Sequence, residues 1–295
     1  MNKIALGLML ASLTLPAWAA KLPVVASFTV VADLTRQIGG DRVDVSTLVG
    51  PDGDAHVFQP SPADVKRVAG AKVFVVNGLG MEGWMTRLTK ASSFKGVLVE
   101  AGKGVKTIKA SAEEGEGHGH DTMDPHAWHD PQRVQVYIRN IADGLIKADP
   151  AGKAEYDKRA ADFSARVKQL DDWAAQRFAA VPSARRKMLT THDAFGYLGN
   201  RYGIRLLAIQ GVSTEAEASA KGVAQLVRQV RKEQVDAVFM ENMSDKRLLE
   251  QLSKEAGVKV GGKLYADALS PAKGPAATWQ DMFRYNVDTI LKSVK

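Results

Sequence analysis

DPAGKAEYDKRAADFSARVKQLDDWAAQRFAAVP (residues 149–182) is the longest helical pattern in this chain. Its apolar side chains recur at steps of three, four and seven, as one face of an α-helix requires: Tyr156, Phe163, Val167, Leu170, Ala174 and Phe178. Asp149-Pro150 predicts its capped start, and Val181-Pro182 predicts its end. Roughly thirty residues at about 1.5 Å each make a helix of about 45 Å. Since no second segment of this kind occurs, the pattern favours a rigid spacer between two lobes over a coiled-coil arm.

Short strands alternate with helices on both sides of this segment. The predicted strands lie at 23–28, 43–49, 72–77 and 97–100, and then at 187–191, 204–209, 235–240 and from 258 onward. Such β-α-β alternation is typical of parallel sheets covered by helices. We therefore expect an α/β fold with two lobes, each a parallel sheet flanked by helices, joined by one long rigid helix. The expected division is an N-terminal lobe at 21–148, the linking helix at 149–181 and a C-terminal lobe at 182–295.

Composition excludes several classes of protein. The chain has 295 residues, is 45% hydrophobic and 25% charged, and carries a formal charge of +7, which is an ordinary globular composition apart from its basic excess. A mean hydropathy of −0.17 argues against a multi-span membrane protein. The chain has no cysteine, so it can form no disulfide, and any metal site must use nitrogen and oxygen ligands.

Residues 1–20 have the features of a secretory signal peptide. Lys3 precedes an apolar run, Pro16 breaks it, and Ala17-Trp18-Ala19 offers a small-x-small cleavage site. Because no cysteine follows the run, we expect no lipid anchor, and no later segment approaches the ~20 apolar residues of a membrane span. These features predict a free periplasmic protein without stable membrane insertion. An exported protein rarely meets nucleic acid, so the basic charge is interpreted as solvated surface.

Residues 111–123 differ in character from the rest of the chain. They are polar and rich in glycine and glutamate, without periodicity, which predicts a mobile surface loop. His118 and His120 lie within this loop, each beside glycine. A glycine-flanked pair cannot hold a rigid geometry, so transient metal capture and no role at all both remain open for these two histidines.

The next stretch, DPHAWHDP (residues 124–131), places two histidines between two prolines. The prolines should keep it out of helix and sheet and fix its backbone, so that the side chains can be aimed. We interpret His126 as a metal ligand, Trp128 as a packing residue and Asp130 as the cap of the following helix. His129 is interpreted as a residue behind the ligands or on the surface.

Four residues follow predicted strands in a way that suggests one site. His56 comes after the strand at 43–49, His126 lies in the proline-bounded loop, His192 follows the strand at 187–191, and Asp267 follows the last strand. Ligands of open parallel sheets bind outside the carboxyl ends of the strands. A lone loop histidine is usually a surface residue, and a lone Asp at a strand end is usually a turn residue. The coincidence of all four predicts a metal site with three nitrogen ligands and one oxygen ligand between the lobes.

Motifs around these residues resemble the zinc/manganese solute-binding proteins of ABC importers, the TroA-like metal-binding family. DAHVFQP (54–60) resembles the family's D-x-H-x-[FY]-x-P segment, and DPHAW (124–128) resembles its D-P-H-x-W segment. THDAFGY (191–197) is similar to its H-x-A-F-x-Y segment. YADAL (265–269) is similar to the segment that supplies the last ligand.

A weaker motif lies between the last two of these. GVST (211–214) through Ala218-Ser219-Ala220 resembles the family's G-[IV]-S…P-S-A run, with Ala218 where the family often has Pro. The matches occur in the family's order and cover essentially the whole mature chain. The resemblance implies a ligand set of His56, His126, His192 and Asp267, and two lobes that close only modestly.

The resemblance also implies a function and a partner. It implies high-affinity capture of a divalent metal in the periplasm and delivery to the transmembrane permease of an ABC importer, by a monomer that is not an enzyme. Imidazole suits zinc and carboxylate suits harder manganese, so three histidines favour Zn²⁺, with Mn²⁺ as the alternative. Family members tuned to manganese often have Glu where this chain has His192. A His-bearing acidic loop before the second ligand is typical of zinc members, although here it is short.

Two other functions were weighed. An exported zinc hydrolase needs an open coordination position and a nearby base, for which Glu241 is a candidate, although a position behind the ligands suits it better. HGHD (118–121) resembles the H-x-H-x-D of metallo-hydrolases, but its Asp comes one position early and no strand precedes it. A fourth ligand, Asp267, would close the site and favour carriage. A sugar- or amino-acid-binding protein would need aromatic or Arg platforms where this chain has histidines.

Overall fold

The computed structural model describes residues 20–110, 123–215, 220–235, 237–244 and 246–294. The expected signal peptide, apart from Ala20, lies outside these residues. The same is true of His118 and His120, and of nearly all of the expected loop at 111–123.

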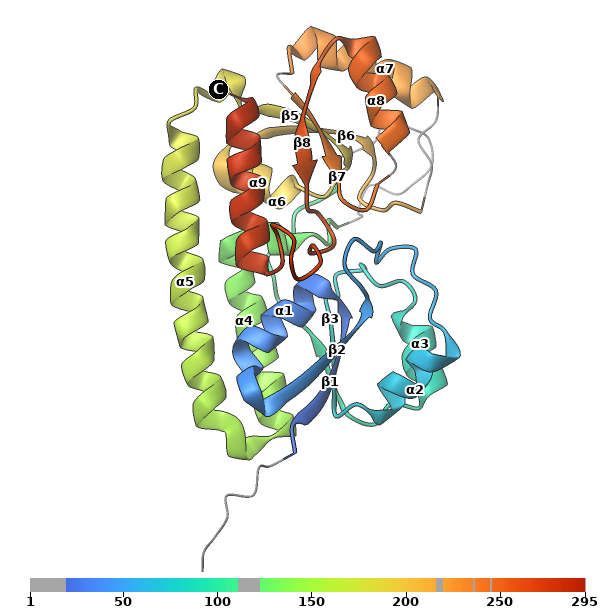
Figure 1. Cartoon of the computed structure of the whole chain (residues 1–295), viewed down its shortest axis with the longest axis vertical. Coiled ribbons are helices and arrows are strands. Elements are labelled where there is room, and N and C mark those ends of the chain that lie inside the picture. The colour runs from blue at the N-terminus through green and yellow to red at the C-terminus, as the bar shows by residue number, and fades with distance from the viewer. Residues whose placement is uncertain (1–19, 111–122, 216–219, 236, 245, 295) are drawn as a thin grey trace, which may run out of the picture.

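Two four-stranded parallel sheets form the centres of the two lobes (Figure 1). The order is β2-β1-β3-β4 in the first sheet and β6-β5-β7-β8 in the second. The strands are β1 (Leu22–Phe28), β2 (Val43–Val49), β3 (Val73–Val76), β4 (Val97–Glu100), β5 (Lys187–His192), β6 (Arg205–Gln210), β7 (Ala237–Glu241) and β8 (Lys259–Leu264). The central strands are runs of apolar residues because helices cover both faces of a parallel sheet. The predicted fold class is confirmed.

Helices cover the sheets and largely begin where the sequence predicts. Their bounds are α1 (Thr29–Gly39), α2 (Pro62–Gly70), α3 (Met85–Ser92), α4 (Pro131–Ala148), α6 (Gly196–Tyr202), α7 (Ala220–Glu233), α8 (Lys246–Ala256) and α9 (Trp279–Ser293). Ser61 caps α2 in a reciprocal capping box with Asp64. Asp130 caps α4 by accepting from the Gln132 N–H, as the sequence predicts.

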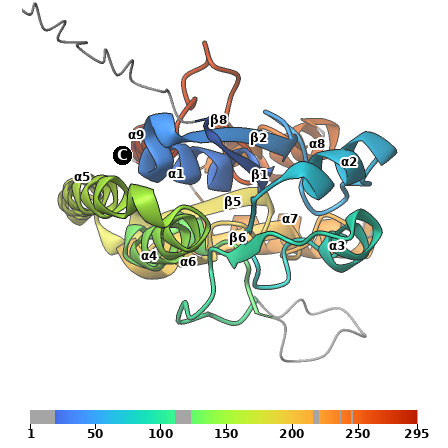
Figure 2. The same ribbon diagram turned by 90° about the horizontal axis from the view of Figure 1, so that it is seen from below.

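The expected long helix is α5 (Lys153–Ala179), which has 27 residues. Its apolar stripe is buried, and it packs against α4, α1, α6 and α9, so it contacts helices of both lobes. In Figures 1 and 2, α5 lies along one side of the molecule while α2 and α3 lie on the other. The interpretation of Asp149 as its cap is wrong, because a 3-10 turn, Pro150–Gly152, comes first. The Asp149 carboxylate instead accepts from Arg42 and from the Tyr156 hydroxyl.

Buried hydrogen bonds tie the lobes together on the side of α5. The backbone N–H of Trp279, at the start of α9, donates to Asp33 of α1 at 2.8 Å. Its indole N–H donates to the Trp128 carbonyl at 3.0 Å, and the Trp128 indole donates to the Ala266 carbonyl at 3.1 Å. One hydrophobic cluster contains buried residues of both lobes. Separating the lobes on this side would therefore break a packed core.

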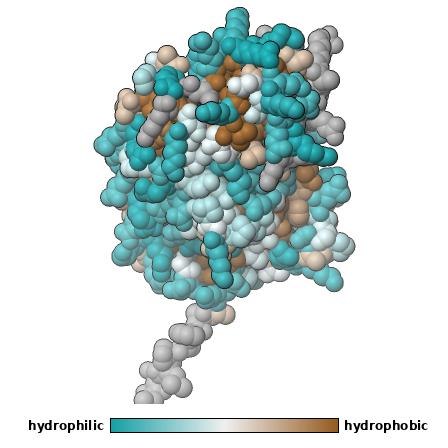
Figure 3. All heavy atoms as spheres, turned by 45° about the horizontal axis from the view of Figure 1, so that its top comes forward, coloured by the Kyte–Doolittle hydropathy of each residue, from teal (hydrophilic) through white to brown (hydrophobic). Residues whose placement is uncertain are grey.

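Figure 3 shows a face that is mostly hydrophilic, interrupted by smaller hydrophobic patches. Among the described residues, the large hydrophobic side chains that are exposed are Val57, Leu98, Met123 and Val260. They come from separate elements of the chain. No helix within the described ranges has the length and apolarity needed to cross a membrane.

Candidate metal centre

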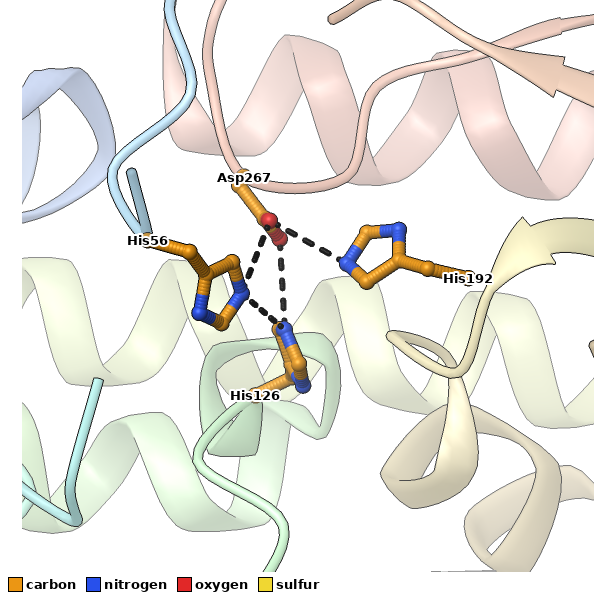
Figure 4. A group of neighbouring side chains, drawn as sticks. All are labelled: His56, His126, His192 and Asp267. Carbon is orange, nitrogen blue, oxygen red and sulfur yellow. Dashed lines mark hydrogen bonds and ion pairs between the residues drawn. The ribbon is translucent and has the colours of Figure 1, made fainter. Parts of the chain in front are cut away.

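The structure brings together the four residues that the sequence singles out (Figure 4). His56 lies in the segment after β2, His126 precedes a 3-10 turn, His192 ends β5, and Asp267 follows β8. One ligand atom from each residue lies within 4.8 Å of the others, and all four side chains are buried. Two residues come from each side of α5, so the cluster joins the lobes at the carboxyl ends of their strands.

The separations between the ligand atoms fit a small ion. Asp267 Oδ2 lies 3.1 Å from His192 Nε2 and 3.4 Å from His56 Nε2, and Asp267 Oδ1 lies 3.5 Å from His126 Nε2. The two Nε2 atoms of His56 and His126 are 3.3 Å apart. Ligand atoms placed at about 2.0–2.1 Å around a tetrahedral ion are about 3.3 Å from one another. The cluster therefore has the dimensions of a tetrahedral metal site.

His126 is held by the carboxylate two residues before it. Asp124 Oδ1 accepts from the His126 backbone N–H and lies 2.8 Å from His126 Nδ1. A proton on Nδ1 satisfies this contact and leaves the lone pair of Nε2 facing the cluster. Burial lowers the pKa of His126 to about 3, so the ring stays neutral and able to bind a cation.

His192 has the same arrangement with a distant partner. Glu241, the last residue of β7, contacts His192 Nδ1 through Oε2. Its Oε1 accepts from the His192 backbone N–H at 2.9 Å and from the Thr191 hydroxyl at 2.7 Å. Burial on its own lowers the pKa of a histidine, but Glu241 and Asp267 raise the pKa of His192 well above its usual value. A cation bound at Nε2 would replace that proton.

Asp267 supplies the negative charge of the cluster. Burial alone would raise its pKa, but the His192 and His126 imidazoles hold it well below its usual value. Both of its carboxylate oxygens are fully buried and accept no hydrogen bond of normal geometry. Buried charged oxygens without donors are costly unless a cation compensates them, so this orphaned carboxylate fits a metal ion.

The remaining residues of the 124–131 stretch have structural positions. Trp128 is fully buried and packs against Phe28 at 5.2 Å between ring centroids. His129 is also buried, with its ring 4.5 Å from that of Phe195, and it is not among the four clustered side chains. The expectation that the prolines exclude helix is wrong for Ala127–His129, which form a 3-10 turn. Proline restricts only its own φ and the residue before it, so a short turn fits between the two prolines.

Sequence reasoning overlooked the carboxylates that precede two of the histidines. Asp54 Oδ1 accepts from the His56 backbone N–H at 2.8 Å, and Asp124 does the same for His126. The repeated D-x-H spacing is a usable signal, because an Asp side chain commonly bonds the backbone two residues on. Glu241 is placed behind His192, and its carboxylate contacts the ring nitrogen that faces away from the cluster. That position does not suit a hydrolytic base.

A buried cluster of three imidazoles and one carboxylate, set between two rigid lobes, defines a class: two-lobe binding proteins for a small cation. The family model "Zinc-uptake complex component A periplasmic" matches residues 24–293. The chain belongs to this ZnuA/TroA family of periplasmic metal-binding proteins, the substrate-binding components of ABC importers. The family works with ABC permease components and is a transport component rather than an enzyme.

Relatives in this family are named for different metals. The chain is 33% identical over 283 residues to a manganese-binding lipoprotein, MntA, of Bacillus subtilis, covering 93% of this chain and 90% of that one. It is 30% identical over 275 residues to the iron-binding protein YfeA of Yersinia pestis, covering 93% and 86%. The solved structure of the periplasmic zinc-binding protein TroA of Treponema pallidum superimposes with a TM-score of 0.87 at 26% identity, covering 93% and 99%.

Proposed function

We propose that this protein captures Zn²⁺ outside the cytoplasmic membrane and delivers it to the permease of an ABC importer. The proposed ligands are Nε2 of His56, His126 and His192 together with the Asp267 carboxylate. Asp124 and Glu241 orient two of the imidazoles from behind, as outer partners of zinc-bound histidines commonly do. His129 would pack behind the site without binding the metal.

The observation that carries the proposal is the donor set with its spacing. Three neutral nitrogen donors and one carboxylate, separated by 3.1–3.5 Å where Asp267 meets the imidazoles, match the size and softness of zinc. Four protein ligands leave no vacant position for a reacting water, which supports carriage over hydrolysis. The same closure would keep the metal from exchanging freely during transfer.

Manganese is the second candidate, and a specific observation favours it. Both Asp267 oxygens face the imidazoles, so this carboxylate could bind through two atoms and raise the coordination number to five. Higher coordination and more oxygen suit Mn²⁺. Relatives named for manganese and for iron support this reading as well.

We also propose the compartment and the form of the protein. Residues 1–20 would be removed on export, leaving a monomer of two lobes, 21–148 and 182–295, joined by 149–181. Several relatives are named lipoproteins, whereas this chain has no cysteine for a lipid anchor. An intact mass of the exported protein that began near Lys21 would support cleavage without lipidation, and a retained or lipid-bearing N-terminus would contradict it.

Metal analysis of protein purified from its own compartment, paired with competition between Zn²⁺ and Mn²⁺, tests the assignment. We expect about one zinc per chain. The matched variant changes His56, His126 and His192 together to Ala and should remove tight binding. Unchanged stoichiometry and affinity in that variant would overturn the proposed site. Manganese in the native protein would transfer the assignment to the second candidate.

A further inference from the structure

Asn242 directly follows Glu241 at the end of β7 and holds the backbone around Asp267. Its Oδ1 accepts from the Ala266 N–H at 3.3 Å, and its Nδ2 donates to the Ala268 carbonyl at 3.2 Å. The Asn242 side chain thus bonds the residue before and the residue after Asp267. Two adjacent side chains, Glu241 and Asn242, position both cluster residues of the second lobe.

The second proton of the Asn242 amide crosses to the first lobe. Nδ2 donates to Asp52 Oδ1 at 2.8 Å, and Asp52 lies in the segment that leads from β2 to His56. The Asp52 backbone N–H also donates to the Leu269 carbonyl, at 3.2 Å. The same amide that holds Asp267 is therefore bonded to the segment that carries His56.

A second side-chain bond crosses the lobes beside the first. Thr214, after β6, donates its hydroxyl proton to Asp54 Oδ2 at 2.7 Å. The other oxygen of Asp54 accepts from the His56 N–H. One carboxylate therefore orients His56 and binds the opposite lobe. The change Thr214→Val would cut only the bond between the lobes.

These contacts differ from those on the side of α5. The bonds of Trp279 and Trp128 are buried in the shared core, whereas the Asp52–Asn242 bond is exposed and the Asp54–Thr214 bond is half-buried. Exposed and half-buried bonds break with less loss of packing than buried ones. The segment at 50–56 is thus the part of the centre that can open while the core stays intact.

We propose that Asp52–Asn242 and Asp54–Thr214 form a latch that holds the 50–56 segment over the metal centre and sets how fast the metal leaves. Asn242 is a positioning residue, because it links Asp267 to the His56 segment through one side chain. The latch rests on the proposed function. It adds that metal release proceeds by movement of this segment, without separation of the lobes at α5.

The test measures the zinc dissociation rate, by stopped flow against excess chelator, in the full mature chain. Thr214→Val and Asp52→Gly should each speed release about three- to tenfold, the worth of one partly exposed hydrogen bond, with zinc stoichiometry unchanged. Gly is chosen at Asp52 because φ there is +56°, where Ala would add strain. Thr214→Ser restores the hydroxyl and should restore the slow rate. Thr47→Val is the matched control, because its hydroxyl accepts from Arg36 within the first lobe.

A double-mutant cycle separates a latch from general loosening. If Asp52 acts through Asn242, the pair Asp52→Gly with Asn242→Ala should release zinc no faster than Asn242→Ala alone. Rates within about twofold of wild type for Thr214→Val and Asp52→Gly, or effects that multiply in the cycle, would overturn the latch. Should Asn242→Ala fail to fold, the Thr214 series decides the question alone. Failure of the proposed function is distinct, since His126→Ala would then keep tight zinc.

Discussion

Glu241→Gln tests whether the carboxylate behind His192 sets the affinity of the metal centre. In the native arrangement Glu241 only accepts, from the Thr191 hydroxyl, the His192 N–H and His192 Nδ1. A ring proton on Nδ1 leaves Nε2 free for the metal. A glutamine in this place has one accepting oxygen and one donating NH₂ group.

Neither orientation of that glutamine satisfies all three partners. With its oxygen toward Thr191 and the His192 N–H, its NH₂ faces Nδ1 and favours the tautomer with the proton on Nε2, which cannot bind metal. With the amide reversed, NH₂ faces the His192 N–H. Either way one buried donor lacks its acceptor when metal is bound, which costs about 1–3 kcal/mol. Because 1.36 kcal/mol is tenfold, zinc affinity should fall about 5- to 150-fold, in line with the roughly 10–100-fold typical of outer partners.

Competition against a chelator of known affinity measures this loss, and Glu82→Gln is the matched control. Glu82 is a buried carboxylate of the first lobe that accepts from Ser27, Asn77 and Gly78 and contacts no residue of the cluster. We expect that control to lose stability while it keeps zinc affinity. Zinc affinity within twofold of wild type in Glu241→Gln would refute the reasoning, as would an equal loss in Glu82→Gln.

Three further predictions concern the centre. His126→Ala should weaken zinc binding by more than the roughly 10–100-fold that loss of an outer partner costs, because it removes a ligand; titration that still gave one tight site would contradict this. Zinc affinity should fall as the pH falls, because the raised pKa of His192 means that protons and metal compete for Nε2. Calorimetry near pH 7 in buffers of different ionisation enthalpy should then show proton release on binding, and no buffer dependence would contradict it. Deleting residues 113–121 should leave the tight site intact in the same titration, because Lys109 and Met123 already pair across the base of this segment; loss of tight zinc would make His118 or His120 a ligand.

The cargo itself offers one more test. His192→Glu should shift preference toward manganese, because it exchanges a nitrogen donor for an oxygen donor. The new carboxylate would meet Glu241, so the change is best paired with Glu241→Gln to avoid a buried like-charge contact. Competition between Zn²⁺ and Mn²⁺ measures the shift, and an unchanged preference would contradict the donor argument.

The sequence predicts local structure well where one periodicity dominates. The stripe from Tyr156 to Phe178 is buried along α5 as predicted, because the 3.6-residue repeat decides which face of a helix meets the core. Predictions failed where a second contact competed with a local signal. Asp149 has the sequence of a helix cap, but Arg42, 107 residues away, takes its carboxylate.

The sequence by itself determined the two α/β lobes, the long helix between them and the four side chains that converge. It could do so because strand ends are local features, and parallel sheets bring such ends to one edge. Only the tertiary structure decided what stands behind and across those side chains. Glu241 reaches His192 over 49 residues of chain, and Asn242 reaches Asp52 over 190. Contacts at such separations depend on how the two sheets are set against each other through α5 and the shared core, and no local pattern encodes that arrangement.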